Sequence, residues 1–335
     1  MEADSILRHY FEAGAWEIAT GGESGWNNTT RYVSAEGRRY VLRVYETHQD
    51  PDKIRFEHEA LLALASGGKL PFAVPAPVRD REGRTFVRLD DGTGRYACLF
   101  AYAKGRRPDS TAPAVARAVG EAVGRLSAAL ADVRPGLEPA YPPYYEMDLA
   151  HASCPPEKIA AFCESPPDGF RPLASQLRRL NEALRDFRVH LPKLRRLPHQ
   201  LIHGDINDSN LLVKLEDPAS IAAVLDFEFC TRDLRAMEPA VVLSGMLDAD
   251  GAEDAIPEFL EGFAGRIRLG ADEAEAIPLL IRLRKLDVFV HFLGRRLDGV
   301  DPEETLREQA ESAANGLEAL REKRGVIERW CSALI

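Results

Sequence analysis

The chain has 335 residues, which is enough for about two domains with a buried core. Hydrophobic residues make up 45% and charged residues 29%, a globular composition that excludes fibrous and disordered proteins. The 43 Lys and Arg residues against 53 Asp and Glu residues give a net charge of −10. This charge argues against nucleic acid as the main partner, because duplex binding depends on basic side chains that neutralise phosphates.

The cysteines and the N-terminal residues indicate the cellular compartment of the protein. Five cysteines, an odd number with no C-x-x-C pair, exclude a zinc ribbon or a disulfide scaffold and indicate a reducing compartment. The first residues show no signal peptide, and no apolar stretch approaches the ~20 residues that span a bilayer. We therefore expect a cytoplasmic protein with no membrane partner.

The first hundred residues have the pattern of a small antiparallel sheet. Two β-rich runs, 30–33 and 39–45, are joined through Ala35-Glu36-Gly37 as a hairpin. Residues 54–65 change to helix formers, and 84–89 with 95–102 form a second hairpin. The order strand, strand, helix, strand, strand predicts one helix packed on this sheet.

After residue 108 the periodicity becomes helical. Apolar residues repeat at three and four positions over 115–133, behind Ser110 or Thr111 as N-cap and with Pro113 near the first turn. Further helices are predicted over 173–191, over 277–297 as a buried core helix, and over 305–321. The sequence thus predicts a boundary near residue 103, between a nucleotide-binding lobe (1–103) and a helical lobe (104–335).

Residues 200–229 are the exception within the helical part. Short apolar runs at 201–202, 211–213 and 221–225 are each followed by polar residues, which predicts short strands that present loops at one edge of a cleft. The strongest motif lies here: His203-Gly204-Asp205 opens H-x-D-x-x-x-x-N, which ends at Asn210, and Asp226 follows sixteen residues later. Transfer of a γ-phosphoryl group needs a carboxylate for the attacking hydroxyl's proton and two oxygen ligands for Mg²⁺. The alternative is that these residues are turn and cap residues.

The motif resembles that of the aminoglycoside phosphotransferase/choline kinase group, over roughly residues 15–300. The resemblance implies an α+β, bilobal protein-kinase-like fold with a small β-rich N-terminal lobe and a larger, mainly helical C-terminal lobe. It implies that Asp205 is the catalytic base, that His203 braces the loop, and that Asn210 and Asp226 hold Mg²⁺. ATP is then the phosphoryl donor, and Asn207 in place of the protein-kinase Lys favours a small-molecule acceptor.

A glycine-rich segment, 21–29, precedes the first hairpin at the position where this family folds a loop over ATP. Backbone N–H groups and the side chains of Ser24, Asn27, Asn28 and Thr29 can bind phosphate oxygens. The alternative is a plain turn.

The strand that carries the phosphate-binding Lys in this family has Arg43 at that position. Arg keeps the charge but is longer and planar. Its expected ion-pair partner is Glu59, with Glu57 as the competitor, although both carboxylates also fit a solvated helix face. The resemblance places adenine at 100–103, where Phe100 and Tyr102 would supply apolar walls.

Three other patterns are weaker. Gly92-Thr93-Gly94-Arg95-Tyr96-Ala97 fits a dinucleotide fingerprint, but a strand follows it, so we interpret it as a hairpin turn. His199 and His203 have the spacing of a zinc pair without its Glu. No P-loop motif occurs in the sequence.

The acceptor side is predicted from two segments, 144–148 and the helix 282–296. On that helix Arg284, Asp287 and His291 share one face and form either a buried network or a binding surface. If they bind the acceptor, Arg on a carboxylate and Asp on an ammonium suit an amino-acid-like molecule. Asp208 and Glu228 are further candidate acceptor contacts.

Within the group, Asp226-Phe227-Glu228-Phe229-Cys230 and Arg43 are similar to the homoserine kinase-like branch, whereas Asp208-Ser209-Asn210 is similar to the aminoglycoside branch. The usual downstream D-L-A is Glu238-Pro239-Ala240 here. We therefore favour a kinase of a homoserine-like amino alcohol or amino acid. The alternatives are an aminoglycoside phosphotransferase, a nucleotide-binding pseudokinase regulator and, more weakly, a protein kinase.

Overall fold

A computed structural model describes residues 2–19, 28–46 and 50–335. By their internal contacts these residues form two compact units, each described separately below. The first unit comprises residues 1–107, 132–140 and 210–228, and the second comprises 108–131, 141–209 and 229–335. The division is thus discontinuous in sequence, and the predicted boundary at residue 103 lies close to the end of the first run, Arg107.

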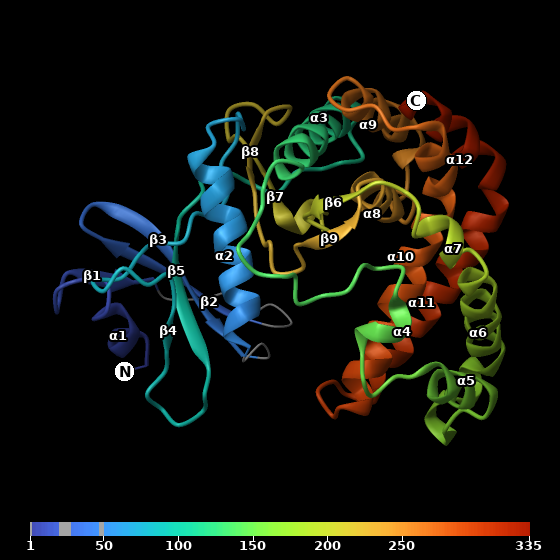
Figure 1. Ribbon diagram of the computed structural model, residues 1–335, viewed down its shortest axis with the longest axis horizontal. Coiled ribbons are helices and arrows are strands. Elements are labelled where there is room, and N and C mark those ends of the chain that lie inside the picture. The colour runs from blue at the N-terminus through green and yellow to red at the C-terminus, as the bar shows by residue number, and fades with distance from the viewer. Residues whose placement is uncertain (1, 20–27, 47–49) are drawn as a thin grey trace. The chain divides into compact units, whose positions relative to one another are not determined.

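The first unit contains a five-stranded antiparallel sheet in the order β1-β2-β3-β5-β4 (Figure 1). Its elements are α1 (Glu2–Leu7), β1 (Trp16–Ile18), β2 (Asn28–Ala35), β3 (Arg38–Tyr45), α2 (Pro51–Ser66), β4 (Val87–Arg88) and β5 (Tyr96–Ala101). Both predicted hairpins and the helix between them are confirmed. The turn between β2 and β3 is Glu36-Gly37, and both residues have positive φ (51° and 72°), the backbone geometry of a tight hairpin turn.

A second hairpin belongs to the same unit. It consists of β7 (Leu211–Val213) and β8 (Ile221–Val224), with Leu211 opposite Val224. Backbone bonds join β8 to Ala73, in the segment after α2, and β7 to Arg106. The two strands predicted at 211–213 and 221–225 are therefore confirmed. The residues that directly precede and follow this hairpin belong to the first unit as well.

The second unit is mainly helical, as predicted. Its helices of four or more residues are α3 (Pro113–Leu130), α4 (Met147–Ala150), α5 (Pro156–Glu164), α6 (Ala174–Arg188), α7 (Leu191–Leu194), α8 (Met237–Met246), α9 (Ala255–Ala264), α10 (Ala271–Leu297), α11 (Glu303–Glu322) and α12 (Arg324–Cys331), beside the 3₁₀ segment Asp168–Leu173. The strands β6 (His199–Ile202) and β9 (Thr231–Leu234) pair antiparallel. Together they hold the ends of the segment that contains the H-x-D-x-x-x-x-N motif.

Helix α10 forms the centre of this unit. Eight of its large apolar side chains are buried: Ile277, Leu280, Ile281, Leu283, Leu286, Phe289, Val290 and Leu293. The helix packs against α6, α8, α11 and α12, which confirms the predicted core helix. The few polar residues on such a helix must find partners inside the protein, because a buried charge without one is costly.

One smaller expectation, about the start of helix α3, is corrected. The N-cap position of α3 is Ala112, without a side-chain cap, so neither Ser110 nor Thr111 caps the helix. The five cysteines are buried free thiols. Within the residues that the structure describes, no helix is both long and apolar enough to cross a membrane.

Candidate active site

The segment after β6 is fixed by a buried carboxylate. Glu238, at the start of α8, accepts hydrogen bonds from the backbone N–H groups of His203 and Gly204, the second at 3.2 Å. Gly204 has φ of +81°, which favours glycine, and a Cβ there would lie 3.1 Å from the Tyr144 ring, so the ring would have to shift. His203 is fully buried, and its Nδ1 accepts from the N–H of Asp205 at 3.2 Å. The predicted bracing role of His203 agrees with this contact.

Glu238 is a residue whose function the sequence did not reveal. It stands where the resemblance expects Asp, and its longer side chain still reaches two N–H groups of the loop. Burial raises the pKa of Glu238 to about 7. Glu in place of Asp therefore still supplies an acceptor for the backbone N–H groups of the loop.

Asp205 presents its carboxylate to an arginine on α10. Arg284 Nη2 lies 2.7 Å from Asp205 Oδ1, and Arg284 Nη1 lies 3.0 Å from Asp287 Oδ2. The guanidinium also lies 5.6 Å from the centre of the Tyr144 ring, whose hydroxyl donates to Gly204 O at 2.9 Å. Three residues predicted for the site from distant motifs, at positions 205, 284 and 287, thus form one cluster.

The prediction that Arg284 binds the acceptor's carboxylate stays a prediction. Each of its Nη atoms already contacts one protein carboxylate, which leaves fewer N–H groups for the acceptor. Asp287 remains suited to an ammonium group: its carboxyl is largely desolvated, which raises its pKa to about 6.

His291 lies one turn further along α10. Its ring contacts those of His151 and Phe229, with centroids 5.3 and 6.4 Å away. Burial lowers the pKa of His291 to about 4, so the ring is neutral at pH 7. It therefore belongs to an aromatic wall and carries no charge for an acceptor.

Two other candidate acceptor contacts have protein partners. Asp208 accepts hydrogen bonds from the backbone N–H of Ser110 at 3.2 Å and from its hydroxyl. Glu228, in the first unit, accepts from Asn28 Nδ2 at 2.6 Å. Both carboxylates thus serve the protein's own packing, and the prediction that they contact the acceptor has no support in the structure.

The residues predicted to hold Mg²⁺ meet at the base of the β7–β8 hairpin. The N–H of Leu225 donates to the backbone O of Asn210 at 2.8 Å, which places Asn210 beside the residue that precedes Asp226. Asp226 has φ of +62°, a left-handed conformation that costs a non-glycine residue about 1–3 kcal/mol. Such strain is found where function requires a particular side-chain direction.

Arg43 lies between two carboxylates of the same unit. Its Nη1 is 3.2 Å from Glu57 Oε1 on α2, and its Nη2 is 3.2 Å from Asp226 Oδ1. The prediction that Glu59 pairs with Arg43 is wrong, because the Glu59 carboxylate accepts a hydrogen bond from the N–H of Gly136 at 2.7 Å. Glu57 is the inward-facing neighbour on the helix, only 3% exposed, and burial raises its pKa to about 7.

This cluster contains polar atoms that the protein leaves unsatisfied. Among the described residues, Arg43 Nε and Asn28 Oδ1 are buried without a hydrogen-bond partner, and buried Asp226 Oδ1 has no hydrogen bond beside its ion-pair contact with Arg43 Nη2 at 3.2 Å. Buried polar atoms of this kind normally have partners, so a set of three indicates groups reserved for a ligand. Carboxylate and amide oxygens are the donors that Mg²⁺ takes, and a free guanidinium N–H suits a phosphate oxygen. The residues present therefore fit both a nucleotide phosphate and its metal.

The glycine-rich segment is only partly described. Ser24 and Asn27 lie outside the described residues. Asn28 and Thr29 begin β2; Thr29 Oγ1 donates to Glu46 Oε1 at 2.9 Å, and Asn28 binds Glu228 as noted above. Asn28 and Thr29 thus stand at the start of the hairpin, as the sequence analysis expects, and the phosphate contacts of the segment stay a prediction.

The segment predicted for adenine ends strand β5. Phe100 is 2% exposed, and its ring packs against His58 and the Arg43 guanidinium, at 5.4 and 5.1 Å. Tyr102 lies under the guanidinium of Arg39, 3.9 Å from the ring centre. Phe100 therefore serves the core behind Arg43, and its role as an adenine wall stays a prediction, as does that of Tyr102.

The remaining motifs have structural explanations. His199 binds Leu197 O through Nδ1 and the Tyr145 hydroxyl through Nε2, so with His203 it forms no zinc pair. Gly92 and Gly94 have positive φ (78° and 76°) in the turn between β4 and β5, as the hairpin interpretation requires.

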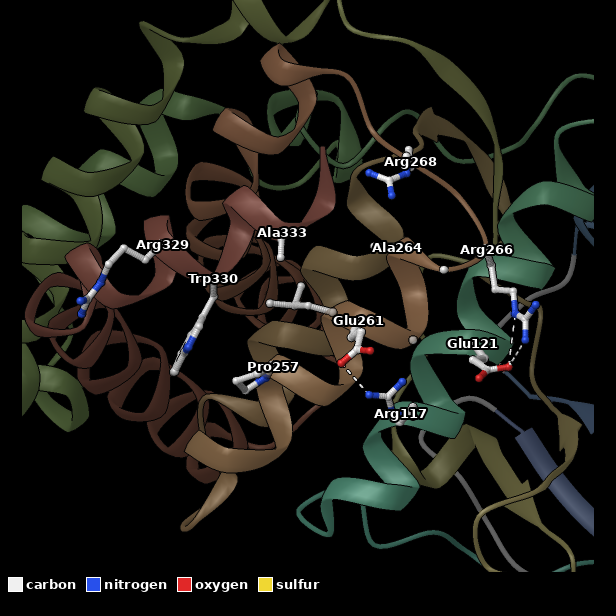
Figure 2. A pocket seen from close by; sticks show the side chains of 13 residues that line it. Arg117, Glu121, Pro257, Glu261, Ala264, Arg266, Arg268, Arg329, Trp330 and Ala333 are labelled. Carbon is white, nitrogen blue, oxygen red and sulfur yellow. Dashed lines mark hydrogen bonds and ion pairs between the residues drawn. The ribbon is translucent and has the colours of Figure 1, made fainter.

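A surface pocket of about 620 Å³ lies among α3, α9 and the C-terminal segment, with Trp330 on one wall (Figure 2). None of the residues predicted for the active site lines it. Its Arg117 and Arg266 form ion pairs with Glu261 and Glu121, shown as dashed lines in Figure 2. This pocket is therefore separate from the residues predicted for catalysis.

Comparison with known proteins agrees with this interpretation. A homoserine kinase of Paramagnetospirillum magneticum is 26% identical over 276 residues, which are 77% of this chain and 75% of that protein. A microcompartment-associated aminopropanol kinase has a structure with TM-score 0.74 and 19% identity, covering 97% of this chain and 98% of that one. An amicoumacin kinase solved with AMP-PNP and Ca²⁺ has TM-score 0.67 and 16% identity, covering 93% and 91%.

The structural likeness confirms the predicted α+β, protein-kinase-like fold. The family model described as "Phosphotransferase enzyme family" matches residues 19–279, more than three quarters of the sequence, including the glycine-rich segment, Arg43 and the motif from His203 to Asp226. The chain belongs to the phosphotransferase enzyme family.

Proposed function

We propose that this protein transfers the γ-phosphoryl group of ATP, with Mg²⁺, to a hydroxyl of a small amino alcohol or hydroxy-amino acid. The observation that carries the proposal is the carboxylate of Asp205, held by Arg284 at 2.7 Å on a loop that Glu238 fixes through backbone N–H groups. A positioned carboxylate of this kind serves as the base in phosphoryl transfer.

In the reaction, the acceptor's hydroxyl oxygen attacks the γ-phosphorus and its proton passes to the Asp205 carboxylate. The bond from the γ-phosphorus to the β,γ-bridging oxygen breaks, and ADP leaves with the bonding electrons. Arg43 binds phosphate oxygens and is oriented by Glu57. Asn210 and Asp226 would hold Mg²⁺, which offsets the charge of the phosphates when bound.

The names of similar proteins support the acceptor class. The relatives include homoserine kinases, and the structural neighbours include an aminopropanol kinase. Both names denote acceptors that combine an amine with a hydroxyl. Asp287, a largely desolvated carboxylate next to Arg284, is the group that suits such an amine.

The test is ADP release by the purified chain with Mg²⁺ and a panel of amino alcohols, hydroxy-amino acids, choline and aminoglycosides. We expect acceptor-dependent turnover with a small amino alcohol or hydroxy-amino acid. Asp205→Asn should lower kcat at least ~10²-fold at unchanged ATP affinity. Asp217→Asn, an exposed carboxylate in the β7–β8 turn, is the control and should leave turnover unchanged.

Three outcomes contradict parts of the proposal. Turnover restricted to aminoglycosides would favour an antibiotic phosphotransferase. ATP binding without turnover on any acceptor would favour a regulatory pseudokinase. Near-normal kcat in Asp205→Asn would mean that another group is the base.

A further inference from the structure

Arg284 joins two carboxylates that come from different parts of the second unit. Asp205 belongs to the loop after β6, whereas Asp287 lies three residues after Arg284 on α10. Each carboxylate occupies a different Nη atom of one planar guanidinium, at 2.7 and 3.0 Å. Because a guanidinium is rigid, the two carboxylates are held in a fixed relation to each other.

Asp205, Arg284 and Asp287 together carry one more negative than positive charge. Arg284 offsets one of the two carboxylates, and two neighbours leave this sum unchanged: Tyr144 is a neutral phenol, and His291 is neutral at pH 7. Asp233 also faces the cluster, as a buried carboxyl with its pKa raised to about 7 by burial. The cluster therefore favours a cation from outside.

Of the two carboxylates, Asp287 is the one that has no role in the proposed chemical step. Among the residues that the structure describes, Arg284 is its one hydrogen-bond partner, through Oδ2. Its side chain is 16% exposed, so it is reached from solvent and is still largely desolvated. A carboxylate in this state binds an ammonium group more strongly than one in water does.

We propose that Arg284 is a positioning residue that holds Asp205 for the acceptor's hydroxyl and Asp287 for its ammonium group. The acceptor is then a molecule whose amine and hydroxyl are separated by a short carbon chain, and a carboxylate on it is not required. This inference rests on the proposed function, since it takes Asp205 as the base. It assigns the selection of the amine to Asp287 and the mutual placement of the two groups to Arg284.

The first test compares acceptors that differ in the amine. Homoserine is paired with 4-hydroxybutanoate, and 3-aminopropan-1-ol with propane-1,3-diol. The parent should prefer each amine in kcat/KM by roughly 10- to 100-fold, the range of a charge-assisted hydrogen bond. Asp287→Asn should abolish most of that preference by raising KM for the amines, with KM for ATP unchanged.

The second test separates positioning from structure. Arg284→Met should lower kcat at least ~10-fold on amines and diols alike, and should move the acidic limb of the pH–kcat profile upward by about one unit or more, because Asp205 and Asp287 lose their shared cation. Arg284→Lys should recover part of both effects. Arg282→Met is the control: Arg282 is on the same helix and pairs with Asp186, so its loss should change neither kcat nor the profile.

The outcomes distinguish this inference from the proposed function. If diols are phosphorylated as well as amines, or if Asp287→Asn keeps the parent's amine preference, the inference is wrong while the kinase assignment stands. If Arg284→Met changes only the melting temperature, Arg284 is structural. If neither amine is phosphorylated but another hydroxyl compound is, the acceptor class is wrong. If no hydroxyl compound is phosphorylated, the proposed function itself fails.

Discussion

Arg43 on β3 and Glu57 on α2 form an ion pair of 3.2 Å across the first unit, fourteen positions apart in the sequence. The pair is buried: the two side chains are 13% and 4% exposed. Tyr45 supports it by donating its hydroxyl to Glu57 Oε2 at 3.2 Å. The guanidinium lies beside Asp226, and within the described part of the chain no group accepts a hydrogen bond from its Nε.

The first prediction is that Arg43 binds ATP. Arg43→Ala should weaken ATP binding by roughly 10- to 100-fold, because charge-assisted bonds to phosphate oxygens are lost. Arg43→Lys should recover part of the affinity, because the ammonium group keeps the charge but cannot bind two oxygens side by side as a guanidinium does. Calorimetric titration with ATP measures both. The control is Arg38→Ala, an exposed residue at the start of the same strand; equal losses in both variants would argue against phosphate contact.

The second prediction concerns which glutamate orients Arg43. Glu57→Gln should weaken ATP binding several-fold, because Arg43 loses the carboxylate that fixes its direction. Glu59→Gln should not, since an amide oxygen still accepts from the N–H of Gly136. The same titration measures these variants. The reverse order of effects would return Glu59 to the role that the sequence predicted.

The third prediction is that Asp226 is a metal ligand. In Asp226→Ala, Mg²⁺ should no longer tighten ATP binding, because one of the ion's carboxylate ligands is missing. ATP affinity is measured with and without Mg²⁺ in the variant, in the parent and in Asp217→Asn. Equal strengthening by Mg²⁺ in all three proteins would exclude Asp226 as a ligand.

The fourth prediction uses the close approach of α3 and α9. A Cβ on Gly262 would lie 2.2 Å from the backbone O of Arg117, so Gly262→Ala forces the helices apart. We expect a loss of about 1–3 kcal/mol in the free energy of unfolding by urea. Gly245→Ala is the matched control on α8, because no atom lies within 4 Å of a Cβ at that position. Alanine there should raise the free energy of unfolding by about 0.5–1 kcal/mol. Equal effects would mean that α3 and α9 have room to adjust.

The fifth prediction is a pH dependence of stability. Burial raises the pKa of Asp233 from 3.8 to about 7 in the folded protein, so the folded state holds this proton more tightly than the unfolded chain does. The resulting stability is fully present below about pH 4 and is lost as the pH rises through about 7. Asn cannot ionise, yet its side-chain oxygen still accepts from the N–H of Tyr144.

The free energy of unfolding of Asp233→Asn relative to the parent should therefore increase between pH 4 and pH 7. Urea titrations at several pH values measure this difference. Asp217→Asn is the control, because a hydrogen bond from Ser220 lowers the pKa of exposed Asp217 from 3.8, so its titration lies below about pH 4 and its difference from the parent should stay nearly flat between pH 4 and pH 7. A flat difference for Asp233→Asn would mean that its carboxyl is not desolvated.

Local pattern alone was sufficient to predict most of the elements. The hairpin through Glu36-Gly37 depends on a turn that needs positive φ, and α10 depends on apolar residues that repeat around the whole helix. The H-x-D-x-x-x-x-N motif also belongs to one short segment, so its residues could be recognised together. These features are encoded within a few neighbouring residues and do not depend on what packs against them.

Only the tertiary structure decided which charged groups meet. Glu57 and Glu59 are two residues apart on one helix, and which of them faces Arg43 depends on how α2 packs on the sheet. Arg284 and Asp205 are 79 positions apart, and no local pattern links them. Glu238 likewise supports the loop at 203–204 through backbone bonds, which a sequence does not display. Spacing along one element is fixed by backbone geometry, but contact between elements depends on the packing of the whole core, because only packing sets their distance and rotation.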